Sequence, residues 1–148
     1  MEILLSGSSG FIGQALLGTL VSSGHRVVPL VRRPGTGDSL QWDPARPPAP
    51  EKLSGFDGVV HLAGKHIAGR WTRQFKDEIR NSRITGTSML SQAVAESFRR
   101  SGKPEVLIAA SAIGFYGDRG SERLTEERSP DSGFLSQLCV DWEAASAP

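Results

Sequence analysis

The sequence predicts an α/β protein with a doubly wound parallel sheet and helices on both faces. Short apolar runs alternate along the chain with longer segments in which apolar residues recur every three or four positions, which is the spacing of an amphipathic helix. The apolar runs are hydrophobic throughout rather than at every second residue, as is typical of parallel strands that are buried on both faces. The two patterns together indicate strands that alternate with the helices covering them.

The expected elements follow one another as strand, helix, strand, strand, helix, strand and helix. The expected strands are 2–7, 25–33, 56–64 and 104–112, and the expected helices are 11–24, 77–102 and 133–145. Gly24 and Gly102 end the first two helices, because glycine readily adopts the left-handed conformation of a C-terminal cap. Pro29 lies inside the second strand and indicates an edge position or a bulge.

At 148 residues the chain is long enough to bury a core and is expected to form one domain, residues 1–148. Residues 34–50 are rich in proline and glycine and are expected to form an ordered surface loop. His61 lies within an apolar run and is expected to be a hydrogen-bonded core residue. Helical spacing predicts the inward-facing residues of the long helix, which are Ile79, Ile84, Leu90, Val94 and Phe98.

The composition excludes several classes of function. A net charge of +1 gives no basic field, so neither nucleic acid nor a membrane is an expected partner. The single cysteine excludes an internal disulfide and a multi-cysteine metal site, and we expect no bound metal. A strand-like run begins at residue 1 and leaves no room for a signal peptide, so we expect a cytoplasmic protein.

A glycine-rich segment, GSSGFIG, joins the first expected strand to the first expected helix. Gly7 permits a tight turn, Gly10 lets the backbone approach a pyrophosphate, and Gly13 lets the helix pack close to the strand. The free N–H groups of the helix start then face the anion. A glycine-rich turn without a ligand is the alternative, but the flanking strand and helix favour dinucleotide binding. The predicted cofactor contacts are Gly7, Ser8, Ser9, Gly10, Phe11, Ile12 and Gly13.

The end of the second expected strand indicates which dinucleotide binds. An acidic residue there would bind the ribose hydroxyls of NAD. This chain has Arg32 and Arg33 instead, and no carboxylate before Asp38. Two arginines at a strand end are otherwise a solvated pair, but their charge and fork geometry suit the 2′-phosphate of NADP. We therefore predict a Rossmann-type, NADP-binding domain in which Arg32 and Arg33 contact the cofactor, NADP (NADPH) being favoured over NAD.

Several motifs resemble those of one protein family. SGSSGFIG, FDGVVHLAG, RITGTSMLSQA and SAIGFYGD occur in the order expected of the extended short-chain dehydrogenase/reductases, the nucleotide-sugar-epimerase-like group. HLAGKHIAGRW, IRNSRITGT and DWEAA resemble, more narrowly, the atypical branch called epimerase family proteins, for which nucleoside-diphosphate-sugar epimerase is the older label. The resemblance covers essentially the whole chain, and it implies the same fold class that the residue patterns predict.

The resemblance implies positions for further cofactor contacts. Asp57 would lie near the adenine, and Leu62, Ala63 and Gly64 would pass close to the cofactor. Ser111, at the end of the last expected strand, would lie beside the nicotinamide. These roles agree with the dinucleotide site that the glycine segment predicts.

The chain departs from the family pattern at the catalytic pair. In the resembling enzymes a Tyr-x-x-x-Lys pair opens the helix after the serine strand, where the tyrosine is the general acid/base and the lysine lowers its pKa. A glutamate commonly follows that lysine by four positions. When the motif is anchored on Glu143, Leu135 takes the tyrosine position and Cys139 the lysine position. The resemblance therefore implies that the standard proton-transfer pair is replaced.

Ser111 and Tyr116 are the remaining catalytic candidates. When the motif is anchored on Tyr116-Gly117, the usual catalytic serine falls on Ala112, with Ser111 one position earlier. Tyr116 is the only tyrosine, although in the resembling enzymes the tyrosine of this Tyr-Gly pair is mainly structural. Acidic residues stand close to Cys139 in sequence, so a packing role is favoured over a nucleophilic thiolate.

Three functions remain open. The first is an NADP(H)-dependent oxidoreductase or epimerase relative, in which Ser111, with Tyr116 or a water, polarises the carbonyl of an unidentified small-molecule substrate. The second is a non-catalytic NADP-binding module that senses redox state or regulates a partner. The third is a truncated cofactor-binding fragment, because the resembling proteins usually continue for about as long again with a substrate lobe. The long helix, residues 77–99, often pairs subunits in these families, which raises the prospect of a homodimer.

Overall fold

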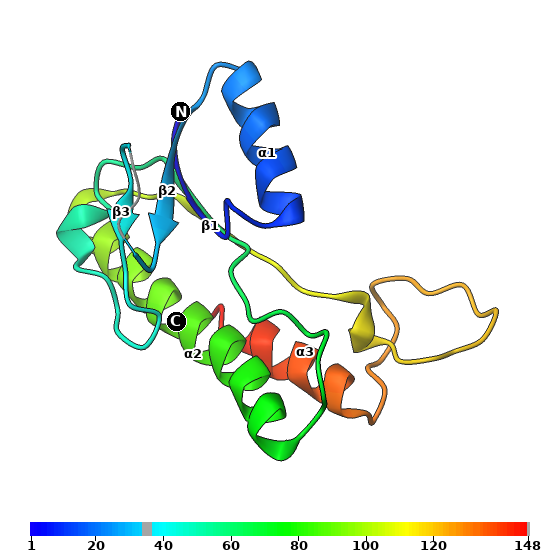
Figure 1. The fold of residues 1–148 in the computed structure, drawn as a ribbon. Coiled ribbons are helices and arrows are strands. Elements are labelled where there is room, and N and C mark those ends of the chain that lie inside the picture. Colours follow the sequence, from blue (N-terminus) through cyan, green and yellow to red (C-terminus); the bar gives the residue numbers. More distant parts are fainter. Residues whose placement is uncertain (34–36, 148) are drawn as a thin grey trace.

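The computed structural model describes residues 1–33 and 37–147. In that part of the chain, parallel strands form a five-stranded sheet in the order β3-β2-β1-β4-β5 (Figure 1). The strands are β1 (Glu2–Ser6), β2 (Arg26–Val31), β3 (Leu40–Gln41), β4 (Gly58–His61) and β5 (Val106–Ala109). Both the strand order and the parallel pairing are those of a doubly wound sheet, so the predicted fold class is confirmed.

Three helices accompany the described sheet: α1 (Phe11–Ser22), α2 (Arg73–Ser101) and α3 (Phe134–Ala144). Two 3₁₀ turns, η1 (Pro50–Lys52) and η2 (Ile113–Phe115), complete the regular structure. Thr72 caps α2 by accepting a hydrogen bond from the N–H of Phe75 at 3.2 Å, so the helix begins four residues before the predicted start at residue 77. Gly102 ends α2 with φ +75°, as its position in the sequence predicted.

The two faces of the sheet bury cores of different size. On the α2 face lies a buried cluster formed by Leu4, Val28, Leu30, Trp42, Leu53, Val59, Leu90, Ala93 and Val94. The α1 face has a smaller cluster formed by Ile3, Leu5 and Val60, against which the half-buried leucines of α1 pack. Val106 and Ile108 of β5 share the α1 side by register with β4, yet they are 43% and 56% exposed. Helix α1 therefore covers its face of the sheet only in part.

The region predicted as an ordered surface loop, residues 34–50, contains a short strand. β3 spans two residues, Leu40 and Gln41, and pairs only with Leu30 and Val31 of β2. The next residue, Trp42, is buried, and its indole N–H donates to the Arg46 carbonyl oxygen at 2.6 Å. A strand of this length has too few residues to show a pattern. Residues 34–36 of the predicted loop lie outside the described residues.

Pro29 lies where β2 has a single neighbour. It pairs with Leu5 of β1, whereas β3 begins its pairing one residue further on, at Leu30. Proline has no N–H to donate, and on the β3 side no strand at this level requires a hydrogen bond from it. The sequence predicted an edge position or a bulge for Pro29. At Pro29 itself β2 is an edge strand, because β3 pairs with β2 only at Leu30 and Val31.

Strands β1 and β4 are adjacent, and the chain leaves their carboxyl ends toward opposite faces. β1 leads into α1 on one face, whereas β4 leads toward α2 on the other (Figure 1). This divergence is the topological switch point of a doubly wound sheet, where ligands of such folds bind. The fold therefore brings the glycine segment after β1 and the segment after β4 to the same point.

The backbone at this point is packed as closely as glycine allows. A Cβ atom on Gly13 would lie 2.1 Å from the carbonyl oxygen of Gly7. A Cβ atom on Gly7, which has φ +72°, would lie 2.8 Å from the carbonyl carbon of Leu62. Because real Cβ atoms do not approach backbone this closely, helix α1, strand β1 and the segment after β4 meet only through these two glycines.

We expect Gly13→Ala to lower the free energy of unfolding by about 3 kcal/mol, because the added methyl group has no space against the Gly7 carbonyl. Gly18 in the same helix is the matched control, since a Cβ there would meet nothing within 4 Å. Gly18→Ala should stabilise the protein by about 0.5–1 kcal/mol through helix propensity. Urea denaturation measures both changes, and two changes of the same sign would contradict the close packing at Gly13.

Candidate cofactor site

The glycine segment presents backbone N–H groups at the carboxyl edge of the sheet. The Gly10 N–H donates to the Gly7 carbonyl at 3.0 Å and closes the turn after β1. Helix α1 then begins at Phe11 with Gly10 as its N-cap, and among the described residues no side chain caps it. The N–H groups of its first turn are therefore left to bind an anion. Main-chain donors of this kind suit the pyrophosphate of a dinucleotide, and the cofactor contacts of these residues stay a prediction.

The side chains of the predicted loop residues contribute little to this cradle. Ser9, Gly10, Phe11 and Ile12 are exposed, and the Phe11 side chain is 94% exposed at the start of the helix. Ser8 is half-buried. An anion at this place would therefore meet main-chain donors first, and the serine and apolar side chains would line its surroundings.

A hydrogen-bonded pair, Ser6 and His61, lies behind the cradle at the ends of β1 and β4. The Ser6 hydroxyl lies 2.6 Å from His61 Nδ1. The same oxygen accepts hydrogen bonds from the N–H groups of Leu62 at 3.2 Å and Ala63 at 3.3 Å. These two bonds occupy the lone pairs of the hydroxyl, so its proton is donated to Nδ1. His61 is therefore neutral and carries its own proton on Nε2.

His61 is a core residue, as its sequence context predicted, but only one of its nitrogens is hydrogen-bonded. Its side chain is almost fully buried, and Nε2 has no hydrogen-bond partner in the described part of the chain. The Trp42 ring packs against the imidazole in an edge-to-face arrangement, with ring centroids 5.9 Å apart. Burial lowers the pKa of His61 to about 4, because a charged imidazolium would lose its hydration there.

The Ser6–His61 pair positions the segment after β4. It holds the backbone of Leu62 and Ala63 against the end of β1, next to Gly7. Gly64 follows and is exposed at the same edge. The structure thus places Leu62, Ala63 and Gly64 beside the glycine cradle.

Arg32 and Arg33 follow β2 at the same edge of the sheet. Both are exposed, and in the described residues neither forms an ion pair with a carboxylate. Asp38, the first carboxylate after them, instead pairs with Arg26. The two guanidinium groups are therefore available for an anionic ligand.

Asp43 follows β3 at the same edge, and the sequence analysis did not identify it. The strand before it has only two residues, too few to show a strand pattern in the sequence.

The prediction for Asp57 is wrong in its placement. Asp57 precedes β4 and therefore lies at the amino edge of the sheet, whereas the cradle lies at the carboxyl edge. A strand of four residues separates the two edges by about 10 Å or more. There Asp57 accepts the Glu2 N–H at 2.7 Å and pairs with Lys103. These contacts, the Lys103 hydrogen bond first, lower the pKa of Asp57, so its role is to join the starts of β1, β4 and β5.

Leu135 and Cys139 face the segment that follows β5. Leu135 packs against Gly114, since a Cβ atom added to Gly114 would lie 3.4 Å from the Cβ of Leu135. The Cys139 thiol lies 3.6 Å from the carbonyl oxygen of Ala112. Cys139 is buried, and this burial, assisted by the charge of Glu143, raises the pKa of its thiol. The side chain at each position of the expected Tyr-x-x-x-Lys pair thus lies in a packed seam, and Cys139 is a protonated core residue.

Glu143 continues this seam one turn further along α3. Its carboxylate accepts a hydrogen bond from the Ser111 hydroxyl, which lies exposed after β5. Tyr116 packs edge-to-face on Phe115, with ring centroids 5.1 Å apart, and no hydrogen bond in the described chain joins it to Ser111. The structure therefore pairs Ser111 with Glu143, a partner that sequence reasoning used only as an alignment anchor.

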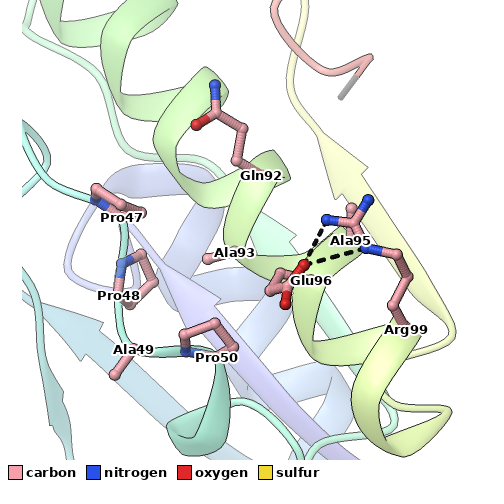
Figure 2. Close-up of a pocket in the computed structure, with 9 residues that line it drawn as sticks. All are labelled: Pro47, Pro48, Ala49, Pro50, Gln92, Ala93, Ala95, Glu96 and Arg99. Atoms are coloured by element: carbon pink, nitrogen blue, oxygen red, sulfur yellow. Dashed lines mark hydrogen bonds and ion pairs between the residues drawn. The ribbon is translucent and has the colours of Figure 1, made fainter.

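A shallow pocket of about 450 Å³ lies between the proline-rich segment 47–50 and the outer face of α2 (Figure 2). Its charged residues, Glu96 and Arg99, are hydrogen-bonded to each other, and it lies away from the carboxyl edge of the sheet.

No cluster of three or more metal-binding side chains occurs in the residues that the structure covers. Nor does any described helix combine the length and apolarity needed to cross a membrane.

We predict that His61 makes the stability of the fold depend on pH. Between about pH 6.5 and 4 the unfolded chain binds a proton at this imidazole and the folded chain does not, so stability falls as the pH is lowered through this window. The loss at the lower end should be about 3 kcal/mol. Urea denaturation of wild type and His61→Gln across this window measures it, and the variant should show the shallower dependence.

The matched control for this measurement is His66→Gln, which removes an exposed imidazole from the loop after β4. Its dependence on pH should follow that of the wild type, because the substitution leaves the buried His61 imidazole in place. Equal slopes in wild type and His61→Gln would contradict the assignment of a buried, neutral His61.

Comparison with known proteins agrees with this architecture. The chain is 43% identical, over 99% of its length, to an epimerase family protein of Mycobacterium bovis, and 32% identical to the human epimerase family protein SDR39U1. It covers 48% and 49% of those two proteins, so it spans about half the length of the curated relatives that it matches.

Solved structures show the same fold. The nucleoside-diphosphate sugar epimerase of Corynebacterium glutamicum is 41% identical, with a TM-score of 0.84 over 99% of this chain and 30% of that one. Human SDR39U1, solved with NADPH, is 28% identical, with a TM-score of 0.82 over all of this chain and 50% of that one. Residues 3–146 match the model of the NAD dependent epimerase/dehydratase family. With its parallel sheet, its glycine cradle and this match over nearly its whole length, the chain belongs to the NAD dependent epimerase/dehydratase family.

Proposed function

We propose that this chain binds NADP(H) at the carboxyl edge of its sheet and forms the cofactor part of an oxidoreductase or epimerase-type protein. One observation carries the proposal: the glycine cradle after β1 and the two arginines after β2 lie at the same edge of the sheet. A dinucleotide spans such neighbouring strand ends, with its pyrophosphate on the helix start and its adenosine ribose toward the second strand. The NADPH of the solved human relative supports the same choice of cofactor.

The preference for NADP over NAD rests on Arg32 and Arg33. An arginine can donate two parallel hydrogen bonds to a phosphate, and this geometry adds specificity as well as energy. An acidic residue at this place would instead repel the 2′-phosphate. Asp43, after β3, is an acidic residue at this edge, and its Oδ1 accepts the Ala45 N–H at 3.0 Å.

The bound cofactor would supply hydride transfer, and the chain would supply proton handling and orientation. Ser111 is the best-placed group for a substrate oxygen, because it follows β5 at the carboxyl edge and is exposed. Its hydroxyl proton is held by the Glu143 carboxylate. A substrate carbonyl would accept a hydrogen bond from the Ser111 hydroxyl in place of Glu143. Glu143 would accept the serine proton during oxidation of an alcohol and return it during reduction of a carbonyl. Tyr116 remains the second candidate for this role.

A non-catalytic, redox-sensing module is the alternative that one observation favours. Leu135 and Cys139 stand where the family pattern places a tyrosine and a lysine, and both pack against the segment after β5. A protein without that pair could still bind NADP(H) and report its redox state to a partner. The two functions share the cofactor site and differ only in turnover.

We expect the double variant Arg32→Ala/Arg33→Ala to weaken NADPH binding by about 10- to 100-fold and to leave NADH binding nearly unchanged. Each charge-assisted hydrogen bond to the 2′-phosphate contributes about 1.5–3 kcal/mol, and NADH lacks that group. Titrations that follow the nicotinamide fluorescence measure both affinities.

The control for this variant is Arg99→Ala/Arg100→Ala, which removes the same charge from the far end of α2. It should change both affinities by less than about twofold, because charges at that distance are largely screened. Equal losses for NADPH and NADH in the Arg32/Arg33 variant would overturn the 2′-phosphate assignment.

If the chain is catalytic, Ser111→Ala should lower the rate of NADPH oxidation by a carbonyl compound at least about 100-fold, because it removes the proton donor. NADPH binding should be unaffected. Ser121→Ala, in an exposed turn, is the control and should keep full turnover. Assays across a panel of carbonyl compounds make the measurement. Turnover that survives in Ser111→Ala would contradict the catalytic role, and binding of NADPH without turnover of any compound would favour the sensor.

A further inference from the structure

A second cation lies at the carboxyl edge, on the opposite side of the segment after β4. Arg83 belongs to the N-terminal half of α2, and its guanidinium is half-buried. Its Nη1 donates to the carbonyl oxygen of Lys65 at 3.0 Å and approaches that of Ile79 at 3.4 Å. Both hydrogen bonds use the same nitrogen, and they fix the group between the helix and the loop after β4.

Contacts from two other elements hold the guanidinium in place. A Cβ on Gly64 would lie 3.3 Å from its Cζ and 3.5 Å from its Nη2, so the group packs flat on the glycine backbone. The Trp142 ring of α3 lies 5.1 Å from Cζ, at cation–π distance. Arg83 is thus ordered by α2, by the loop and by α3, in contrast to a solvated surface arginine.

The other edge of this guanidinium has no partner in the described chain. Within residues 1–33 and 37–147, neither Nε nor Nη2 forms a hydrogen bond and no carboxylate forms an ion pair with Arg83. Arg80, one turn earlier on the same helix, is by contrast paired with Asp141 at 2.6 Å. Burial lowers the pKa of Arg83, and the nearby Cys139 thiol offsets this effect only in part. A half-buried, ordered guanidinium with free donors along one edge can bind an anionic group of a ligand.

The unused edge defines the chemical class of that anion. Nε and Nη2 of an arginine form the fork that donates two parallel hydrogen bonds to a carboxylate or a phosphate. The pyrophosphate of a dinucleotide has its own place at the start of α1, on the other face of the sheet. Arg83 comes from α2, beyond Gly64, and near Cys139 of α3. An anion at its fork would therefore be distinct from the cofactor pyrophosphate.

We propose that Arg83 is the substrate-anchoring residue of this site and that its Nε–Nη2 edge binds a carboxylate or phosphate group of the substrate. The proposal rests on the cofactor site described under the proposed function. It narrows the substrate to a compound that carries an oxyanion near the group that reacts. Arg83 lies in the long amphipathic helix α2, and the sequence analysis gave it no functional role.

The test uses the complete chain, saturated with NADPH, and titrates it separately with inorganic phosphate and with acetate, followed by calorimetry. At least one of the two anions should bind, and the stronger one identifies the oxyanion class. Arg83→Gln should raise its dissociation constant at least about tenfold, since a bidentate, charge-assisted contact is lost. Arg83→Lys, which keeps the charge without the fork, should also weaken binding. NADPH affinity should stay within about twofold, as expected for a group that does not contact the cofactor.

Arg80→Gln is the matched control, from the same helix and with the same change of charge, and it should leave anion binding within about twofold. The Nε–H resonance of Arg83 in the wild-type chain should shift on anion addition, which gives a measurement that needs no variant to fold. If neither anion binds the wild type, or if Arg83→Gln binds as well as the wild type, the proposal is overturned.

Two further outcomes separate this proposal from the proposed function. A tenfold or greater loss of NADPH affinity in Arg83→Gln would assign the fork to the cofactor and overturn the substrate role. A wild-type chain that binds an anion through Arg83 but fails to bind NADPH would support the anion site and reject the proposed cofactor.

Discussion

The close backbone contact at Gly7 and Gly13 is the constraint on which the site depends. The missing Cβ atoms let α1, β1 and the segment after β4 meet with main-chain atoms in contact. The N–H groups at the start of α1 therefore lie directly over the end of β1, where the parallel sheet brings its other carboxyl ends. A cradle built in this way depends on the absence of side chains.

The Ser6–His61 pair supports this contact from behind. A serine at the end of β1 bonds to two N–H groups and one imidazole at once, so Leu62 and Ala63 are held without a charged group. A charged imidazolium in the same place would be buried against Trp42 and would lack a carboxylate partner among the described residues. Neutrality is thus a condition of the packing, and the positive charge of the site comes instead from arginines at its two sides.

The sequence predicted the parts of the fold that depend on local pattern. Alternating apolar runs and helical spacing placed the strands and helices, and the glycine spacing located the cradle. Phe98 was expected to face inward but is 50% exposed, whereas its neighbour Ser97 is buried; the spacing of apolar residues does not show where a helix ends its contact with the sheet. Asp57 was placed by resemblance. The direction of its strand would have put it at the amino edge, where the structure has it.

Contacts between distant segments could not be read from the sequence. Arg83 meets Gly64 and Trp142, residues that lie far from it along the chain and on two other elements. No local pattern distinguishes it from Arg80, which occupies the preceding turn and pairs with Asp141. The difference between a solvated ion pair and an anion-binding fork arises only when α2, α3 and the loop after β4 are packed together.

On helix α3, three residues of one face contact the segment that follows β5. Leu135, Cys139 and Glu143 are spaced by four residues and contact the segment after β5 in reverse order, at Gly114, Ala112 and Ser111. The first two contacts are apolar or weakly polar, and neither is made by a tyrosine or a lysine. The third ends in a carboxylate bonded to an exposed hydroxyl. If this helix takes part in acid/base chemistry, the Ser111–Glu143 pair is the part of this face where a carboxylate meets an exposed hydroxyl.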